Sequence, residues 1–152
     1  MSLGSGADLL RAVTESRKEI EDVVGAEMAT MCLSLGEADV LTVVLVARDY
    51  AATPSEIADW LSVTTAGTTG RLNSLSSKGL IERRPHASDG RSLTVHLTAP
   101  GRKLAKRVVA TKDEVMRTRI VERLGTDAAA QLVRDLDALI DAARSDDSNA
   151  GR

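Results

Sequence analysis

Apolar residues recur at helical spacing in two stretches near the ends of the chain. The first stretch runs from about Asp8 to Leu35, and its apolar residues are Leu9, Leu10, Val13, Ile20, Val23, Val24, Met28 and Met31. The second follows Gly125, and its apolar residues are Leu132, Val133, Leu136, Leu139, Ile140 and Ala143. Residues spaced three or four apart lie on one face of a helix, so both stretches are predicted to be amphipathic helices. A lone helix as long as the first would leave its apolar face in water, and we expect it to pack against a partner.

The middle of the chain predicts three shorter helices. The run "VLTVVLVA" lies in a helix from about Glu37 to Arg48 and is apolar nearly all round, which indicates a central place in the core. The sequence "TPSE" at 53–56 has the pattern of a capping box with proline at the first helical position, and the helix it starts should run to about Leu61. Thr64 can cap the next helix, which runs to Lys78 and is closed by Gly79. Two short helices joined by a tight turn have helix-turn-helix spacing.

The second of these two helices has one apolar and one polar face. Thr68, Leu72 and Leu75 fall at i, i+4 and i+7 and are predicted to face the core. The opposite face is polar and almost free of charge, with Arg71 on its flank; it carries Thr65, Thr69, Gly70 and Asn73. Short polar side chains can approach the floor of a DNA groove, where hydroxyl groups contact phosphates or bases.

Two strands and a further long helix complete the pattern. The segments "LIERR" and "SLTVHL" are predicted strands, and the Asp89-Gly90 pair between them is a strong hairpin signal. A helix then extends from about Pro100 to Leu124. The fold class is therefore mainly α, with a small two-stranded antiparallel sheet.

Composition narrows the setting of this fold. The chain has 152 residues, which suits one domain, or one domain with appended helices. Aromatic residues make up 1% of the chain, so aliphatic side chains must build the core. Cys32 is the single cysteine, which excludes an intramolecular disulfide and indicates a reducing, cytoplasmic setting. Trp60 is expected to pack partly under the following helix.

The net charge of −2 hides a strong asymmetry along the chain. Residues 71–107 contain nine basic and two acidic residues, whereas residues 1–70 contain four basic and eleven acidic ones. A basic block within an acidic protein is typical of a surface that binds a polyanion, although a solvated charged face would have the same composition.

Catalytic and metal-binding patterns are missing from the sequence. There is no G-x-S-x-G elbow, no glycine-rich phosphate loop and no cysteine–histidine pairing, and His86 and His96 have no ligand cluster at metal spacing. We therefore expect no enzyme activity, no catalytic residue, no metal and no cofactor.

From about Leu41 to Arg107 the chain resembles the MarR family of winged helix-turn-helix transcription regulators. The resemblance is carried by "SEIADWLSVT", by "RLNSLSSKGLIERRP" and by "SDGRSLTVHLTAPGRKL". It implies a winged helix-turn-helix domain over 36–99 and a helical dimerisation region over 8–35 and 100–144. It also implies a homodimer that binds a pseudo-palindromic operator in double-stranded DNA, as a repressor. The polar composition of 145–152 separately predicts a disordered tail.

The resemblance implies a role for particular residues. The helix from Thr65 to Lys78 would lie in the major groove, and Arg91 would reach the minor groove. Asp89 would orient an arginine or fix the wing turn. The family often has D-R-L where this chain has Asn73-Ser74-Leu75. Binding is therefore expected to depend more on the wing and on Arg71, Arg83, Arg84 and Arg102. The predicted DNA-binding residues are Thr65, Thr69, Arg71, Asn73, Arg83, Arg84, Asp89, Arg91 and Arg102.

The sequence gives little information on how the binding of DNA would be regulated. The resemblance implies a small aromatic or phenolic effector, for which the sequence has no binding signature. Cys32 could instead make the protein a redox sensor, but a lone cysteine near the end of an apolar helix is more often a buried hydrophobic residue. A helical interaction protein that does not bind DNA is a further alternative, which would leave the basic block unexplained.

Overall fold

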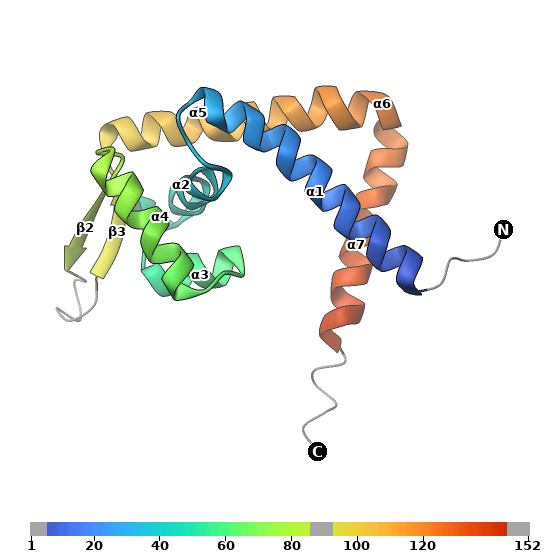
Figure 1. Ribbon diagram of the computed structural model, residues 1–152, viewed down its shortest axis with the longest axis horizontal. Coiled ribbons are helices and arrows are strands. Elements are labelled where there is room, and N and C mark those ends of the chain that lie inside the picture. Colours follow the sequence, from blue (N-terminus) through green and yellow to red (C-terminus); the bar gives the residue numbers. More distant parts are fainter. Residues whose placement is uncertain (1–5, 86–92, 146–152) are drawn as a thin grey trace, which may run out of the picture. The chain divides into compact units, whose positions relative to one another are not determined.

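The computed structural model describes residues 6–85 and 93–145. Its helices are α1 (Gly6–Thr30), α2 (Leu35–Val46), η1 (Arg48–Tyr50), α3 (Pro54–Leu61), α4 (Thr65–Ser77), α5 (Ala99–Met116), η2 (Arg117–Val121), α6 (Glu122–Leu124) and α7 (Thr126–Ser145). Its strands are β1 (Ala51–Ala52), β2 (Ile81–Pro85) and β3 (Leu93–Leu97) (Figure 1). The fold is mainly helical with a small antiparallel sheet, as predicted. The chain divides into two compact units, Met1–Lys112 and Asp113–Arg152.

Helix α2 is the centre of the first unit. Ala38, Val40, Leu41 and Val44 are completely buried, which confirms the central place predicted from its apolar run. Around it are buried residues of α1, α3, α4, the sheet and α5; they include Met28, Ile57, Leu72, Leu75, Val95, Ala105 and Val108. Among the described residues, the buried apolar side chains are all aliphatic or methionine, and Glu37 and Thr68 are buried with them.

The prediction that the first helix continues to Leu35 is wrong. Helix α1 ends at Thr30, and Cys32 follows in the left-handed region with φ of 57°. Ser34 then starts α2 through a capping box, in which its hydroxyl accepts from the Glu37 amide while the Glu37 carboxylate accepts from the Ser34 amide. The same turn leaves Cys32 exposed, so the expectation that this thiol is buried is also wrong.

The starts of the two helix-turn-helix helices are as predicted. Thr53 and Glu56 form a capping box ahead of Pro54, and the Thr64 hydroxyl accepts from the Gly67 amide at the start of α4. Helix α4 ends at Ser77, and Gly79 has φ of 68°, a conformation that glycine adopts without strain.

The sheet has three strands in the order β1-β3-β2, one more than predicted. β2 and β3 form the expected antiparallel pair, in which Arg83 lies opposite Val95. The additional strand, β1, has two residues and is too short to show a periodic pattern in the sequence. Asp49 and Tyr50, just before it, both have positive φ and turn the chain from α2 toward the sheet edge. The predicted turn residues Asp89 and Gly90 lie outside the described residues.

The start of α5 packs closely against the segment that leaves α4. The Thr98 hydroxyl donates to the carbonyl of Gly79 at 2.7 Å, and the Thr98 amide donates to the carbonyl of Leu80 at 3.1 Å. A Cβ at Gly101 would lie 1.8 Å from the Leu80 carbonyl oxygen, so only glycine fits there. These contacts fix the sheet relative to the end of α4.

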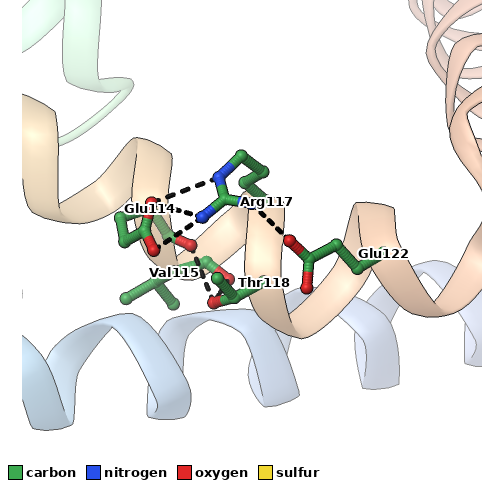
Figure 2. Close-up of polar contacts among 5 residues, drawn as sticks. All are labelled: Glu114, Val115, Arg117, Thr118 and Glu122. Atoms are coloured by element: carbon green, nitrogen blue, oxygen red, sulfur yellow. Dashed lines mark hydrogen bonds and ion pairs between the residues drawn. The ribbon is translucent and has the colours of Figure 1, made fainter.

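The second unit is a helical segment with one ion-pair cluster. Five residues at Arg117–Val121 are π-helical, and Arg117 binds the Glu114 carboxylate at 2.7 Å and also contacts Glu122 (Figure 2). Both carboxylates raise the pKa of Arg117, the hydrogen-bonded Glu114 most strongly. The helix predicted to run to Leu124 is thus interrupted by this π-turn, and Gly125 ends it with φ of 84°.

In the described residues no single helix is both long and apolar enough to cross a membrane. Only α1 and α2 taken together pass on length and composition, and the chain bends by 83° between them.

A buried carboxylate joins α2 to α4. The Glu37 side chain is 7% exposed and accepts hydrogen bonds from the Ser74 hydroxyl at 2.6 Å and from the Lys78 ammonium at 2.7 Å. Lys78 also donates to the carbonyl of Cys32. Burial by itself would raise the pKa of Glu37, but these donors, the Ser34 amide and the charge of Lys78 outweigh it and lower the pKa to about 2.

We expect Glu37→Gln to lower the free energy of unfolding at neutral pH by up to about 3 kcal/mol. The pKa in the folded state lies below the ordinary value of 4.5, so the stabilisation is complete above that pH and is lost as the pH falls toward 2. Urea unfolding at equal protein concentration, measured between neutral pH and pH about 2.5, should therefore show a flatter dependence for the variant. Glu15→Gln, in an exposed pair with Arg11, is the control and should change stability by less than about 0.5 kcal/mol. Identical pH profiles for Glu37→Gln and the unmodified protein would contradict the role given to this carboxylate.

Candidate nucleic-acid interface

The outer face of α4 is exposed and uncharged, as predicted. Thr68, Leu72 and Leu75 are buried, whereas Thr65, Thr69 and Asn73 are exposed and follow one another at intervals of four residues. The Thr69 hydroxyl donates to the carbonyl of Thr65 at 2.9 Å. A row of two hydroxyls and one amide along a helix is chemically suited to base edges and phosphates.

Arg83 joins this row from the neighbouring strand. Its Nη2 donates to the Asn73 Oδ1 at 2.7 Å. Arg83 is on the same side of β2 as the buried Ile81, because residues two apart on a strand share a face. The arginine therefore connects β2 to the exposed face of α4.

Arg71 is on a different side of α4. A Cβ at Gly36 would lie 2.5 Å from the Arg71 Nε, which means that the guanidinium covers the first turn of α2. With Ser34, Glu37, Gly70, Ser74 and Lys78, it lines a shallow pocket there. The structure thus separates Arg71 from the row formed by Thr65, Thr69 and Asn73.

Arg84 and Arg102 are also apart from that row. Arg84 forms an ion pair with Glu82, on the face of β2 opposite to Arg83. The Arg102 guanidinium lies 5.8 Å from the centre of the Tyr50 ring, a cation–π contact at the end of the sheet order opposite to β2. Asp89 and Arg91 lie outside the described residues.

Sequence reasoning missed the partners of these side chains. The contacts Arg83–Asn73, Arg71–Gly36 and Arg102–Tyr50 join residues that are 10, 35 and 52 positions apart. No local motif signals them. The capping role of Glu37 could have been predicted from the S-x-x-E pattern at Ser34, which marks where α2 begins, but its partners Ser74 and Lys78 have no local signal.

A cavity of about 250 Å³ lies beside α2 and α3. It is lined by Val43, Val46, Ala47, Arg48, Ala51, Ala52, Glu56 and Trp60. The Trp60 indole is 72% exposed and Val46 is 64% exposed, so the expectation that Trp60 packs under the following helix is wrong. Large apolar side chains at the edge of a concave surface are typical of a binding site for an apolar molecule.

In the part of the chain that the structure describes, no histidine, cysteine, aspartate or glutamate side chains gather in a group of three or more that could hold a metal ion.

Comparisons with known proteins agree with this geometry. Residues 33–92 match the model of the MarR family. The HTH-type transcriptional repressor YetL of Bacillus subtilis is 30% identical over 95 residues, which is 62% of this chain and 57% of the repressor. The match therefore spans less than two thirds of that relative's length.

Solved structures share the fold over nearly the whole chain. A mutant MarR from Escherichia coli complexed with operator DNA has a TM-score of 0.78 at 23% identity, and the match covers 87% of this chain and 93% of that one. CouR from Rhodococcus jostii, bound to p-coumaroyl-CoA, has a TM-score of 0.76 at 19% identity, with 91% and 95% covered. At these identities the structures establish the fold, and the family match applies to residues 33–92. Residues 33–92, which hold α2, α3, α4 and β2, therefore belong to the MarR family of winged helix-turn-helix transcription regulators.

Proposed function

We propose that this protein is a homodimeric DNA-binding repressor that acts in the cytoplasm on a pseudo-palindromic operator. The observation that carries the proposal is the exposed row Thr65, Thr69 and Asn73 on α4, with Arg83 of the adjacent strand bonded to it. The relative YetL, a repressor, and the MarR complex with operator DNA support the same assignment.

In this proposal α4 enters the major groove and Arg91 enters the adjacent minor groove. Thr65, Thr69 and Asn73 have no charge. Phosphate groups therefore do not attract them strongly, and they can contact base edges. Arg91 would gain from the concentrated negative potential of a narrow minor groove. Arg71, Arg84 and Arg102 then contribute phosphate contacts from three separate places, which position the protein and carry no sequence information.

The dimer is proposed from exposed apolar side chains on α1 and α7. Leu9, Leu10 and Val13 of α1 are between 36% and 68% exposed. On α7, Leu132, Val133, Leu136 and Ile140 share one face and are between 40% and 58% exposed. Apolar faces of this length on two helices are expected to pack against a second copy, since single chains rarely leave them in water. A dimer would place two α4 helices about one turn of DNA apart.

We further propose that a small aromatic or phenolic effector binds in the cavity beside Trp60. Its lining offers an exposed indole for stacking, apolar side chains from α2 and a cation at Arg48. CouR, whose structure holds p-coumaroyl-CoA, is a relative in fold with a ligand of phenolic character. Because the cavity joins α2 to α3, an occupant that fits only one arrangement of these helices would shift the population of DNA-binding states.

Selection of bound sequences from random duplexes tests DNA binding directly. We expect enrichment of two half-sites in inverted orientation whose centres are about 10 base pairs apart. Failure to retain any duplex at low salt would favour an interaction protein that does not bind DNA.

Arg91→Ala should weaken binding to the selected duplex and reduce the slope of log affinity against log salt by about one unit. The physical reason is the loss of one ionic contact and of the counterion that it releases. Fluorescence anisotropy at several salt concentrations measures both quantities. Arg11→Ala removes the same charge from an exposed pair on α1 and should leave the slope unchanged. Equal slopes for the two variants would refute the wing contact.

Leu136→Glu should raise the dimer dissociation constant by about 100-fold, because each interface would bury an unpaired carboxylate from both copies. Sedimentation equilibrium gives this constant, and operator affinity should fall with it. Ala138→Glu adds the same charge to α7 on a different face and should leave the dimer intact. A fully dimeric Leu136→Glu variant would show that this face is not the interface.

Trp60 is the only tryptophan in the chain, so its fluorescence reports on the cavity. Titration with p-coumaroyl-CoA and with free phenolic acids should shift the emission to shorter wavelength, because an occupant displaces water from the indole. The same ligands should lower operator affinity. Val46→Asp should abolish both responses while operator affinity without ligand stays unchanged. An unchanged spectrum at saturating concentrations of every ligand would exclude this site for this class.

A further inference from the structure

The hydrogen bond between Arg83 and Asn73 has a consequence for how Asn73 can contact a base. The Asn73 amide has one acceptor, Oδ1, and two donors on Nδ2, whereas a guanidinium has five donors and no acceptor. Only the oxygen of the amide can therefore face Arg83, and it lies 2.7 Å from Nη2. This contact directs the NH₂ group of Asn73 away from Arg83, on the exposed face of α4.

The orientation limits what Asn73 can recognise. A freely rotating asparagine binds adenine through both of its polar atoms, since Oδ1 accepts from N6 and Nδ2 donates to N7. The bond from Arg83 keeps Oδ1, which has a second lone pair, turned toward the arginine, so the amide presents its Nδ2 donors on the side away from Arg83. Among the major-groove edges, guanine offers two neighbouring acceptors, N7 and O6, whereas adenine places a competing donor beside its N7.

We propose that Arg83 is a positioning residue that fixes the Asn73 amide, so that Asn73 reads guanine and discriminates against adenine at one position of each half-site. The inference rests on the proposed DNA-binding function and assigns its specificity. Arg83 is suited to the task because it comes from β2, whose place is set by the buried Ile81 and by pairing with Val95. A side chain anchored in the sheet holds the amide more firmly than a neighbour on α4 could.

The test compares base preference, because overall affinity would also fall if Arg83 contacts phosphate. Selection from random duplexes with the unmodified protein identifies the position where guanine is required. Duplexes with guanine or adenine there are then compared by anisotropy. We expect the unmodified protein to prefer guanine by about tenfold, within the range of a good two-bond contact to a base.

Arg83→Met should reduce this preference to about twofold or less, because the released amide can rotate and bind adenine through both atoms. Asn73→Asp keeps the acceptor for Arg83 and removes both donors, so it should also lose the guanine preference. The matched control is Arg84→Met, which removes the same charge from the next residue of β2, where the partner is Glu82. It should weaken binding to both duplexes equally and leave the ratio unchanged. Because Arg83 is exposed, the Arg83→Met variant is expected to fold. Thermal unfolding checks that it does.

Each outcome has a distinct meaning. If the unmodified protein binds no duplex, the proposed function fails and the assignment of Asn73 fails with it. Suppose instead that the unmodified protein binds DNA and that Asn73→Asp changes the base preference at one position of the half-site. If the unmodified protein selects adenine at that position, the amide is not fixed as proposed. If Arg83→Met keeps the guanine preference of the unmodified protein, as Arg84→Met is expected to do, Arg83 does not position Asn73.

Discussion

The buried carboxylate of Glu37 is the constraint on which the position of α4 depends. Apolar packing between α2 and α4 is non-directional and would allow the helices to rotate or slide. A buried charge is different, because it is tolerated only where its hydrogen bonds are made. Glu37 receives donors from Ser34, Ser74 and Lys78, so one rotation of α4 satisfies it. That rotation buries Leu72 and Leu75 and turns Thr69 and Asn73 outward.

Exposed apolar surface distinguishes the second unit from the first. Among its described residues, Val115 is the one buried side chain, and none of α7 is buried. A helix of 20 residues gains little stability from its own hydrogen bonds in water and needs packing on an apolar face. The four aliphatic residues on one side of α7 provide such a face. This argument favours the proposed assembly with another copy over a free-standing helical tail.

Local signals predicted the helix-turn-helix well, because each of its boundaries depends on residues close in sequence. Thr53 and Glu56, Thr64 and Gly79 mark the ends of α3 and α4 within a few positions. The same S-x-x-E signal at Ser34 was overlooked because the apolar spacing of α1 continues past its true end. Charge counting placed Arg71 and Arg102 with Arg83, yet their contacts with Gly36 and Tyr50 depend on tertiary packing that spacing in one sequence does not reveal.

In the proposed complex with DNA, charge and hydrogen bonding have separate roles, which would make an acidic chain selective. Arginines at separate places attract any phosphate backbone, so they raise affinity for all sequences alike. Discrimination must then come from groups that gain nothing from phosphate charge, and the outer face of α4 supplies only such groups: Thr65, Thr69 and Asn73. The bond from Arg83 to Asn73 connects the two functions, since a cation from the sheet orients an uncharged amide on the helix. In this proposal a displacement of β2 would therefore alter base preference as well as affinity. If α4 alone determined the base contact, a displacement of β2 would leave base preference unchanged.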